Sequence, residues 1–362
     1  MSLLENIYEC ADFFLTRTSL SSLEILNSHL NQNRDDLLHF AMNDPVFLEA
    51  ITIASPTLSR SIHRFIQSTD KNAGELKKIR AGMLKYFLRM SSRATPFGLF
   101  SFVWWGKFSD KTHLQFEQSD IKKSIRPDME WIYSLINLLS KDYSYIRHFK
   151  VMTSPFIYEE CGKYYLKKLN ASTNKEELTS IKHTEFTQKA FSIAKTPIAY
   201  LELERKLLSL FSKYDPKKIT DCLWDIFQKE YFINELYPEV NKPFNVEKFL
   251  LFLSQHKEQM ILPECQTALR VLLDFCMLIR EYQEAPIGDG MIQLDNLKKV
   301  AKQIMETENV IQLDAFKNNG EAFLSQELKR LIEEIASVLC HFSSQQSRLD
   351  HISDYHSEFT EK

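Results

Sequence analysis

The stretch between residues 60 and 93 concentrates cationic side chains whose types and spacing suit the binding of phosphate groups. Nine lysines and arginines lie there against two acids, Asp70 and Glu75, so the stretch carries a charge of +7 in a chain of net charge −3. Guanidinium groups match the geometry of phosphate oxygens, and arginines on successive helical turns can hold neighbouring phosphates. The alternative is a solvated helix face whose cations pair with acids from elsewhere in the chain.

The sequence predicts a helix that begins near Gly74 and places several of these cations on one face. Apolar residues recur three or four positions apart and predict the face that packs on a core: Leu76, Ile79, Met83, Tyr86 and Met90. Another face carries, at the same spacing, Lys78, Lys85, Arg89 and Arg93. The helix should end near Ser92, because the residue before a proline, here Thr95, is disfavoured in a helix and the proline has no N–H. Gly98 then permits a tight turn into a strand over 99–105.

The segment from Arg89 to Phe100, RMSSRATPFGLF, closely resembles the signature of the N-terminal region of lantibiotic dehydratases, the nisin-dehydratase-like enzymes that modify Ser and Thr of a precursor peptide. In that family the region belongs to a glutamylation domain, which moves glutamate from glutamyl-tRNA to a peptide hydroxyl. The resemblance implies that Arg89, Arg93 and Thr95 lie where the tRNA acceptor end and its ester are handled. Candidates for tRNA binding on the same segment are Lys78, Arg80 and Lys85.

Three further residues match positions that the resembled family uses for glutamylation. Arg17 ends a short apolar strand, where a lone arginine usually has a structural role. Asp128 lies in the block RPDMEW and should cap the helix 129–139, a role that explains an aspartate there by itself. Asp314 lies at the end of the strand-like segment 309–316, where an aspartate is usually a cap or turn former. The resemblance implies that all three belong to the glutamylation site.

The implied reaction exchanges one ester for another, so the enzyme mainly positions its substrates and handles a proton. It needs a cationic surface for the acceptor stem, a group that receives the hydroxyl proton and donors to the tetrahedral oxyanion. We expect Asp128 or Asp314 to assist the proton transfer, and Thr95 or an arginine to stabilise the oxyanion. We expect no metal and no tightly bound cofactor, with glutamyl-tRNA as the co-substrate.

The chain has 362 residues, of which 44% are hydrophobic and 26 are phenylalanine, which is enough for two or three structural units with sizeable cores. We predict an α+β fold of mixed helices and short antiparallel sheets, with an embedded winged-helix-like unit and a helical C-terminal part. Residues 1–148 should form the N-terminal part of the tRNA-dependent glutamylation domain. Residues 149–240 should form the winged-helix-like unit, and residues 241–362 the helical continuation of the glutamylation domain.

The winged-helix-like unit is predicted from its order of strands, three short helices and a closing strand. The third helix, which Asp215 and Pro216 open, has three cations and three acids and is therefore poorly suited to a nucleic-acid groove. The family resemblance implies instead that the unit binds the leader of the precursor peptide, which adds as a strand to a sheet edge. The sequence leaves open which strand offers that edge.

Several other kinds of site and location are not indicated. The six cysteines are dispersed without a CxxC pair and are expected to be reduced thiols, most of them in a core. No glycine-rich phosphate loop is present. His351 and His356 stand five apart in a polar tail, which favours a solvated pair over a metal site. The N-terminus is not a secretory signal, and no window approaches eighteen uncharged apolar residues. We therefore expect a cytoplasmic protein with no membrane span.

The resembled enzymes continue well beyond the length of this chain, through the rest of the glutamylation domain and, in complete versions, an elimination domain. The sequence ends inside an apparent helix without a C-cap glycine, so we expect a truncated chain that lacks elimination activity. The expected partners are the precursor peptide, through its leader and core, and glutamyl-tRNA. A further chain could supply the missing part of the glutamylation domain and an elimination domain.

Three other functions remain open from the sequence. A non-catalytic leader-peptide-binding subunit would keep its peptide affinity after Arg89→Ala and Arg93→Ala and would not bind tRNA. A peptide aminoacyl-tRNA ligase that uses another amino acid is a variant of the first interpretation. An RNA-binding or purely structural α+β protein would carry the motif by chance.

Overall fold

The structure is a computed structural model that describes residues 7–32, 39, 42–68, 72–95, 98–115, 117, 120–170, 175–239, 241–242, 244–317, 322–342 and 350–360. Two units are interleaved along the chain. The first comprises Met1–Arg34, Leu84–Lys122 and Ala315–Lys362, and the second comprises Asp35–Met83 and Lys123–Asp314. The elements that run from one unit into the other are α5 (Ala73–Ser92), β4 (Ile121–Pro127) and β11 (Ile311–Lys317).

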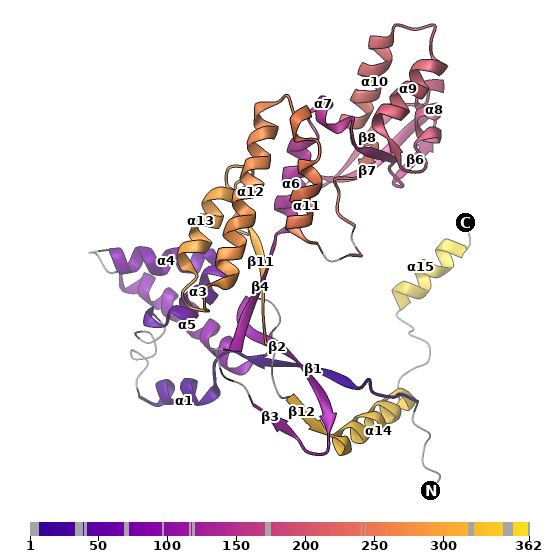
Figure 1. Ribbon diagram of the computed structural model, residues 1–362. Helices are drawn as coiled ribbons and strands as arrows, with labels where there is room; N and C mark the ends of the chain where they lie inside the picture. Colours follow the sequence, from indigo (N-terminus) through magenta and orange to yellow (C-terminus); the bar gives the residue numbers. More distant parts are fainter. Residues whose placement is uncertain are drawn as a thin grey trace. The chain divides into compact units, whose positions relative to one another are not determined.

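The first unit is built on β2 (Gly98–Ser109), the longest strand of a six-stranded sheet (Figure 1). β1 (Phe13–Ser19) pairs with β2 antiparallel, while β12 (Ala322–Ser325) pairs with its C-terminal end in parallel. The strand order is β3–β12–β2–β11–β4, in which β3 is His113–Leu114. The sheet is therefore mixed, whereas the sequence predicted short antiparallel sheets. The difference arises because β12 returns to β2 from more than two hundred residues further along the chain.

The helices of the first unit include one whose apolar face is exposed. Besides the end of α5, the unit contains α1 (Leu23–Gln32), α14 (Gln326–Phe342) and α15 (Asp350–Thr360). The polar face of α14 contacts the N-terminal segment, since Ser337 Oγ accepts a hydrogen bond from Ile7 N (3.0 Å) and Lys329 pairs with Asp12 (3.2 Å). The opposite face exposes large apolar side chains, namely Leu331, Ile332, Ile335, Val338, Leu339 and Phe342.

The second unit is a helical body whose core lies between α6 and α12. Prolines open α3, α4 and α12, because their missing N–H is not needed in the first turn of a helix. Trp131 of α6 stacks on Phe275 of α12 with 4.3 Å between ring centroids, and its indole N–H donates to Ala301 O (3.0 Å). The helices around this core are α3 (Pro45–Ala54), α4 (Pro56–Gln67), α6 (Met129–Leu139), α11 (Val246–Ser254), α12 (Pro263–Glu284) and α13 (Met291–Ala301) (Figure 1).

The same unit contains the strands and helices of the segment for which the sequence predicted a winged-helix-like unit. One three-stranded sheet has the order β10–β5–β9 and the other the order β6–β7–β8. The strands are β5 (Lys150–Thr153), β6 (Ile157–Glu160), β7 (Lys163–Asn170), β8 (Lys175–Lys182), β9 (Ile198–Ala199) and β10 (Phe232–Asn234). The helices are α7 (Tyr143–Ile146), α8 (Glu185–Ile193), α9 (Tyr200–Leu210) and α10 (Pro216–Gln228). The division of the chain at residues 148 and 240 stays a prediction.

Three features of the side chains and helices can be stated for the described part of the chain. All six cysteines are free thiols, but only Cys265 and Cys276 are buried, so the expectation that most of them lie in a core is wrong. No group of three or more His, Cys, Asp or Glu side chains within the described ranges could hold a metal ion. Within the same ranges, no helix combines the length and the apolar character that crossing a membrane requires.

Candidate functional site

In the first unit, α5 brings its last cations to the point where two strands meet. Arg89 lies in the last turn of α5 and Arg93 just beyond its end. Ser21 N donates to Met90 O (3.1 Å), and Leu20 N donates to Phe100 O (3.0 Å). These bonds hold the end of β1, the end of α5 and the start of β2 together. We call this region the α5 corner; its predicted site residues are Arg17, Lys85, Arg89, Arg93 and Thr95.

The two arginines of the α5 corner are held differently. The guanidinium carbon of Arg89 lies 5.6 Å from the centroid of the buried Phe100 ring, which fixes the half-buried side chain by a cation–π contact. Arg93 is exposed. Neither forms an ion pair with another described residue, unlike Arg64, which pairs with Glu75 (2.6 Å). Among the described residues, the cation–π contact with Phe100 is the interaction recorded for the side chain of Arg89.

The other predicted residues of the corner are placed by backbone contacts. The carbonyl of Thr95 accepts a hydrogen bond from Ser101 Oγ, which ties the end of the helix to β2. Arg17 stands on β1 opposite Val103 of β2 and is exposed. Lys85 is exposed on α5, one turn before Arg89. The predicted end of the helix at Ser92 is confirmed, while Pro96 and Phe97 lie outside the described residues.

The two predicted aspartates belong to the second unit and lie on neighbouring elements. Asp128 Oδ1 accepts from Glu130 N (2.9 Å), which confirms its predicted capping of α6. Asp128 N donates to Val310 O (3.0 Å), so this residue lies beside the entry to β11, the strand that carries Asp314. Both carboxyl side chains are half-buried. The structure thus places Asp128 beside the start of β11, while Asp314 lies four residues after Val310 along that strand.

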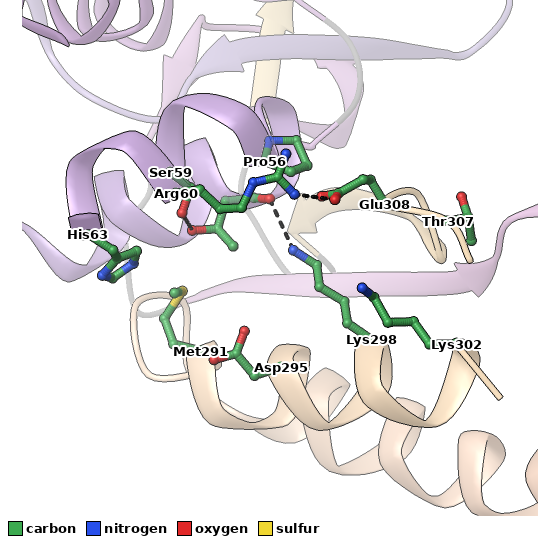
Figure 2. A pocket seen from close by; sticks show the side chains of 11 residues that line it. Pro56, Ser59, Arg60, His63, Met291, Asp295, Lys298, Lys302, Thr307 and Glu308 are labelled. Atoms are coloured by element: carbon green, nitrogen blue, oxygen red, sulfur yellow. Dashed lines mark hydrogen bonds and ion pairs between the residues drawn. The ribbon is translucent and has the colours of Figure 1, made fainter. Parts of the chain in front are cut away.

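A pocket between α4 and α13 was not predicted from the sequence (Figure 2). We call it the α4–α13 pocket; its volume is about 320 Å³. Its charged and titratable lining residues are Arg60, His63, Asp295, Lys298, Lys302 and Glu308. The sequence offered one indication of this pocket, namely that Lys298 and Lys302 stand four positions apart. Because Arg60 is far from both in the chain, the sequence does not show that the three side chains line one pocket. The predicted cations Lys78 and Arg80 lie in the same unit, exposed on the first half of α5.

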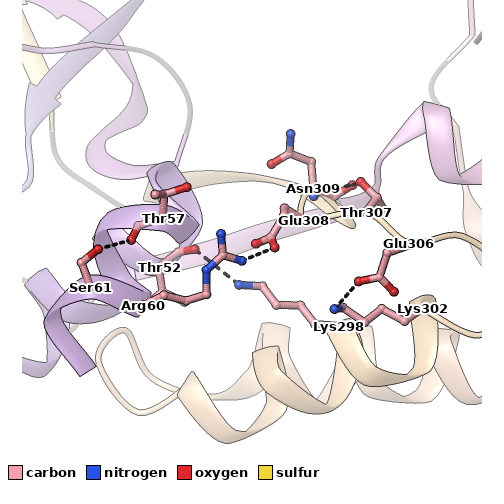
Figure 3. Close-up of polar contacts among 10 residues, drawn as sticks. All are labelled: Thr52, Thr57, Arg60, Ser61, Lys298, Lys302, Glu306, Thr307, Glu308 and Asn309. Atoms are coloured by element: carbon pink, nitrogen blue, oxygen red, sulfur yellow. Dashed lines mark hydrogen bonds and ion pairs between the residues drawn. The ribbon is translucent and has the colours of Figure 1, made fainter. Parts of the chain in front are cut away.

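The cations of the α4–α13 pocket differ in their partners (Figure 3). Arg60 forms an ion pair with Glu308, and Lys302 Nζ lies 2.5 Å from Glu306 Oε1. Lys298 Nζ donates to the carbonyl of Thr52 at a long 3.5 Å. Burial lowers the pKa of Lys298, and the charges of Arg60 and Lys302 act in the same direction, although neighbouring carboxylates oppose them. Lys298 is therefore the most weakly partnered of these cations.

A buried charged cluster holds β4, the strand that leads to Asp128. The side chain of Glu49, on α3, is fully buried and accepts from Lys123 Nζ of β4 (3.2 Å) and from Tyr282 OH (2.7 Å). It also accepts from the backbone N–H groups of Gly288 (2.5 Å) and Gly290 (3.4 Å). Burial lowers the pKa of Lys123, which the carboxylate of Glu49 opposes. The cluster thereby anchors the strand that precedes Asp128.

The family profile described as "Lantibiotic dehydratase, N terminus" matches residues 43–362. The chain belongs to this family. Subtilin biosynthesis protein SpaB of Bacillus subtilis is 30% identical over 361 residues, which are 99% of this chain and 34% of SpaB. This lantibiotic dehydratase chain therefore spans about a third of the length of that relative. The resemblance that RMSSRATPFGLF indicated is confirmed.

Two solved structures are similar to this chain in fold. The tRNA-dependent lantibiotic dehydratase MibB from Microbispora sp. 107891 superposes with a TM-score of 0.83 at 21% identity, over 97% of this chain and 33% of MibB. The glutamylation domain of TbtB from thiomuracin biosynthesis superposes with a TM-score of 0.55 at 12% identity, over 84% of this chain and 36% of that one. The predicted class of mixed helices and short sheets is thus confirmed as the lantibiotic dehydratase fold.

Proposed function

We propose that this chain forms part of an enzyme that transfers glutamate from glutamyl-tRNA to Ser and Thr hydroxyls of a ribosomally made precursor peptide. This transfer is the activation step before dehydration. The observation that carries the proposal is the α5 corner, where the RMSSRATPFGLF motif presents Arg89 and Arg93 without ion pairs to other described residues. The likeness to a glutamylation domain supports the same assignment at the level of the fold.

The chemistry is an exchange of esters. The peptide hydroxyl oxygen attacks the glutamyl carbonyl carbon, a new C–O bond forms, and the bond to the tRNA ribose oxygen breaks. The hydroxyl proton passes to a carboxylate, Asp128 or Asp314, and returns to the ribose oxygen as it leaves. The guanidinium of Arg89, fixed over Phe100, and the side chain of Thr95 are the candidates that stabilise the oxyanion. Arg17 and Arg93 would hold the negatively charged acceptor end.

The proposal is tested by incubating the chain with precursor peptide, tRNA, glutamate and glutamyl-tRNA synthetase. The expected product is a peptide heavier by one glutamyl residue, found by mass spectrometry with and without added polypeptide that matches the rest of the relatives. Arg89→Ala and Arg93→Ala should each lower the adduct by roughly a hundredfold, as expected when a charged transition-state contact is lost. Arg270→Ala, an exposed arginine of α12, is the matched control. Adducts unchanged in both corner variants would refute the proposal, and another adduct mass would indicate another amino acid.

The leader of the precursor peptide is proposed to add to the edge of the β6–β7–β8 sheet. Within the described residues β8 pairs with β7 alone and spans eight residues, twice the length of the other edge strand, β6. Its backbone can therefore accept a further strand, which gives affinity through main-chain hydrogen bonds. Leu178 of β8 is 59% exposed and offers an apolar contact beside that edge.

The leader assignment can be tested apart from glutamyl transfer. Leu178→Glu should weaken binding of a fluorescent leader peptide, while Leu210→Glu, at a leucine of α9 that is 57% exposed, should not. Arg89→Ala and Arg93→Ala should leave leader affinity unchanged, because these residues belong to the α5 corner. Equal affinities of the Leu178→Glu and Leu210→Glu variants would contradict the proposed edge.

A further inference from the structure

The α4–α13 pocket collects positive charge from two helices that are far apart in the sequence. Arg60 enters it from α4 and Lys298 from α13, while Lys302 enters it from the residue that follows the end of α13 (Figure 2). These side chains point toward one another across the hollow. A ligand in the pocket would therefore contact cations on two opposite walls.

The polar contacts in the pocket leave its central ammonium poorly satisfied. Lys298 has three N–H donors and is half-buried, and within the described residues its ammonium donates to Thr52 O at a long 3.5 Å (Figure 3). Buried charges usually carry closer partners, because an unpaired charge away from water is costly. An anion between Arg60 and Lys298 would accept these donors and separate two like charges.

Two further hollows continue from the pocket along α4. The first, of about 490 Å³, shares Arg60 and His63 with the α4–α13 pocket and adds Arg64. The second, of about 810 Å³, shares Arg64 with the first and reaches Lys78 on α5. Because each hollow shares residues with the next, the three form one series within the second unit. Their cations are spaced along this series and could follow the backbone of an extended polyanion.

We propose that the α4–α13 pocket binds a phosphate group of an RNA backbone, and that the two adjoining hollows hold the neighbouring phosphates. A phosphodiester carries non-bridging oxygens that can accept from both walls of the pocket, from Arg60 and from Lys298 or Lys302. The choice of RNA as the ligand rests on the proposed function, in which a tRNA is the co-substrate. The choice of a phosphate group rests on the cations of the pocket and does not depend on that function. The site is distinct from the α5 corner, which handles the ester.

Glu308 sets the affinity of the pocket in this account. Its carboxylate pairs with Arg60, so an incoming phosphate must compete for the guanidinium. Removal of the charge by Glu308→Gln should free Arg60 and tighten binding of RNA by roughly threefold, the worth of an exposed ion pair. A purely structural role of Glu308 predicts no gain of affinity.

The test measures binding of a fluorescent tRNA acceptor-stem minihelix by anisotropy at several salt concentrations. Lys298→Met and Lys302→Met should each weaken binding by roughly tenfold and reduce the slope of log affinity against log salt by about one. Lys299→Met is the matched control, because Lys299 is exposed on the same helix outside the pocket and its loss changes the net charge equally. It should bind RNA with the affinity of the unmodified chain.

Thermal melts identify variants that fail to fold. The side chain of Lys302 is 44% exposed, so this residue tolerates substitution more readily than Lys298.

The outcomes separate the alternatives. Equal affinities for the Lys298→Met, Lys302→Met and Lys299→Met variants, or no gain from Glu308→Gln, overturn the site. A second experiment adds inorganic phosphate or AMP to the bound minihelix. If either compound displaces the minihelix at a concentration near the dissociation constant of the minihelix, the ligand is a free phosphate compound and the RNA assignment is overturned. The binding assay does not require glutamyl transfer, so a failure of the proposed function leaves its result intact, and the reverse also holds.

Discussion

Replacement of Glu49 by leucine should lower the free energy of unfolding by about 5 kcal/mol, because it leaves a buried ammonium and buried neutral donors without their acceptor. The side chain of Glu49 is 0% exposed and that of Lys123 is 1% exposed. Removal of one partner of a buried ion pair costs about 3–5 kcal/mol, and each buried donor left unpaired costs about 1–3 kcal/mol. Burial already lowers the pKa of Lys123. In the Glu49→Leu variant this lysine can therefore lose its proton, which limits the total loss of stability.

The companion variants separate the charge from the hydrogen bonds. Lys123→Met should cost about 3 kcal/mol, because Glu49 keeps its bonds from Tyr282 OH and Gly288 N. The double variant Glu49→Leu with Lys123→Met should cost about 4 kcal/mol, which is about 4 kcal/mol less than the sum of the single changes. The orphaned charge is then absent, but the donors of Tyr282 and Gly288 still lack an acceptor.

Urea unfolding followed by tryptophan fluorescence measures these differences from the midpoint and slope of each transition. Glu202→Leu is the matched control, since the side chain of Glu202 is 54% exposed and pairs with Lys206 on the surface of α9. It should cost at most about 0.5 kcal/mol. A Glu49→Leu variant within about 1 kcal/mol of the unmodified chain, or a double variant equal to the sum of the singles, would refute the reasoning.

Three further substitutions test close packing and exposure in the same urea assay. Gly290→Ala should cost about 3 kcal/mol, because a Cβ there would lie 2.2 Å from a ring carbon of the buried Tyr282; a cost below that of a surface change would contradict the geometry. Gly106→Ala should cost about 1 kcal/mol, since its Cβ would lie 2.1 Å from the Phe14 ring, which is half-buried and can turn aside. Equal losses in these two variants would count against that distinction. Leu339→Gln on α14 should change the free energy of unfolding by less than about 0.5 kcal/mol, because this side chain is 62% exposed. It should also reduce the light scattered by self-associated protein. A large loss of stability would show that the apolar face of α14 is packed against another part of the protein.

The features that the sequence predicted well depend on local chemistry. The Thr95–Pro96 step predicted the end of α5 at Ser92, because the clash before proline acts within two residues. Asp128 was identified as the cap of α6 from its position before a run of helix formers, and its carboxylate does accept from the first turn. The family motif could be recognised because its residues are contiguous.

The features that were missed depend on contacts between distant segments. β8 has the sequence KEELTSIK, whose charges suit a helix as well as a strand, and its pairing with β7 over eight residues decides the outcome. Lys123 occupies a buried position of β4 where the strand pattern predicts an apolar residue, and its partners Glu49, Pro286 and Tyr282 come from distant segments. Lys298 and Arg60 lie far apart in the chain, so their shared pocket could not be foreseen.

Transfer of a labelled glutamyl group from preformed glutamyl-tRNA to the precursor peptide, in a single turnover without synthetase, tests the central claim most directly. We predict that label leaves the tRNA and appears in the peptide as a base-labile ester, with the chain alone or after addition of polypeptide that matches the rest of the relatives. The transfer should be lost in Arg89→Ala and Arg93→Ala and retained in Lys299→Met. Label that is released only as free glutamate, or that reaches the peptide equally in both arginine variants, would contradict the account.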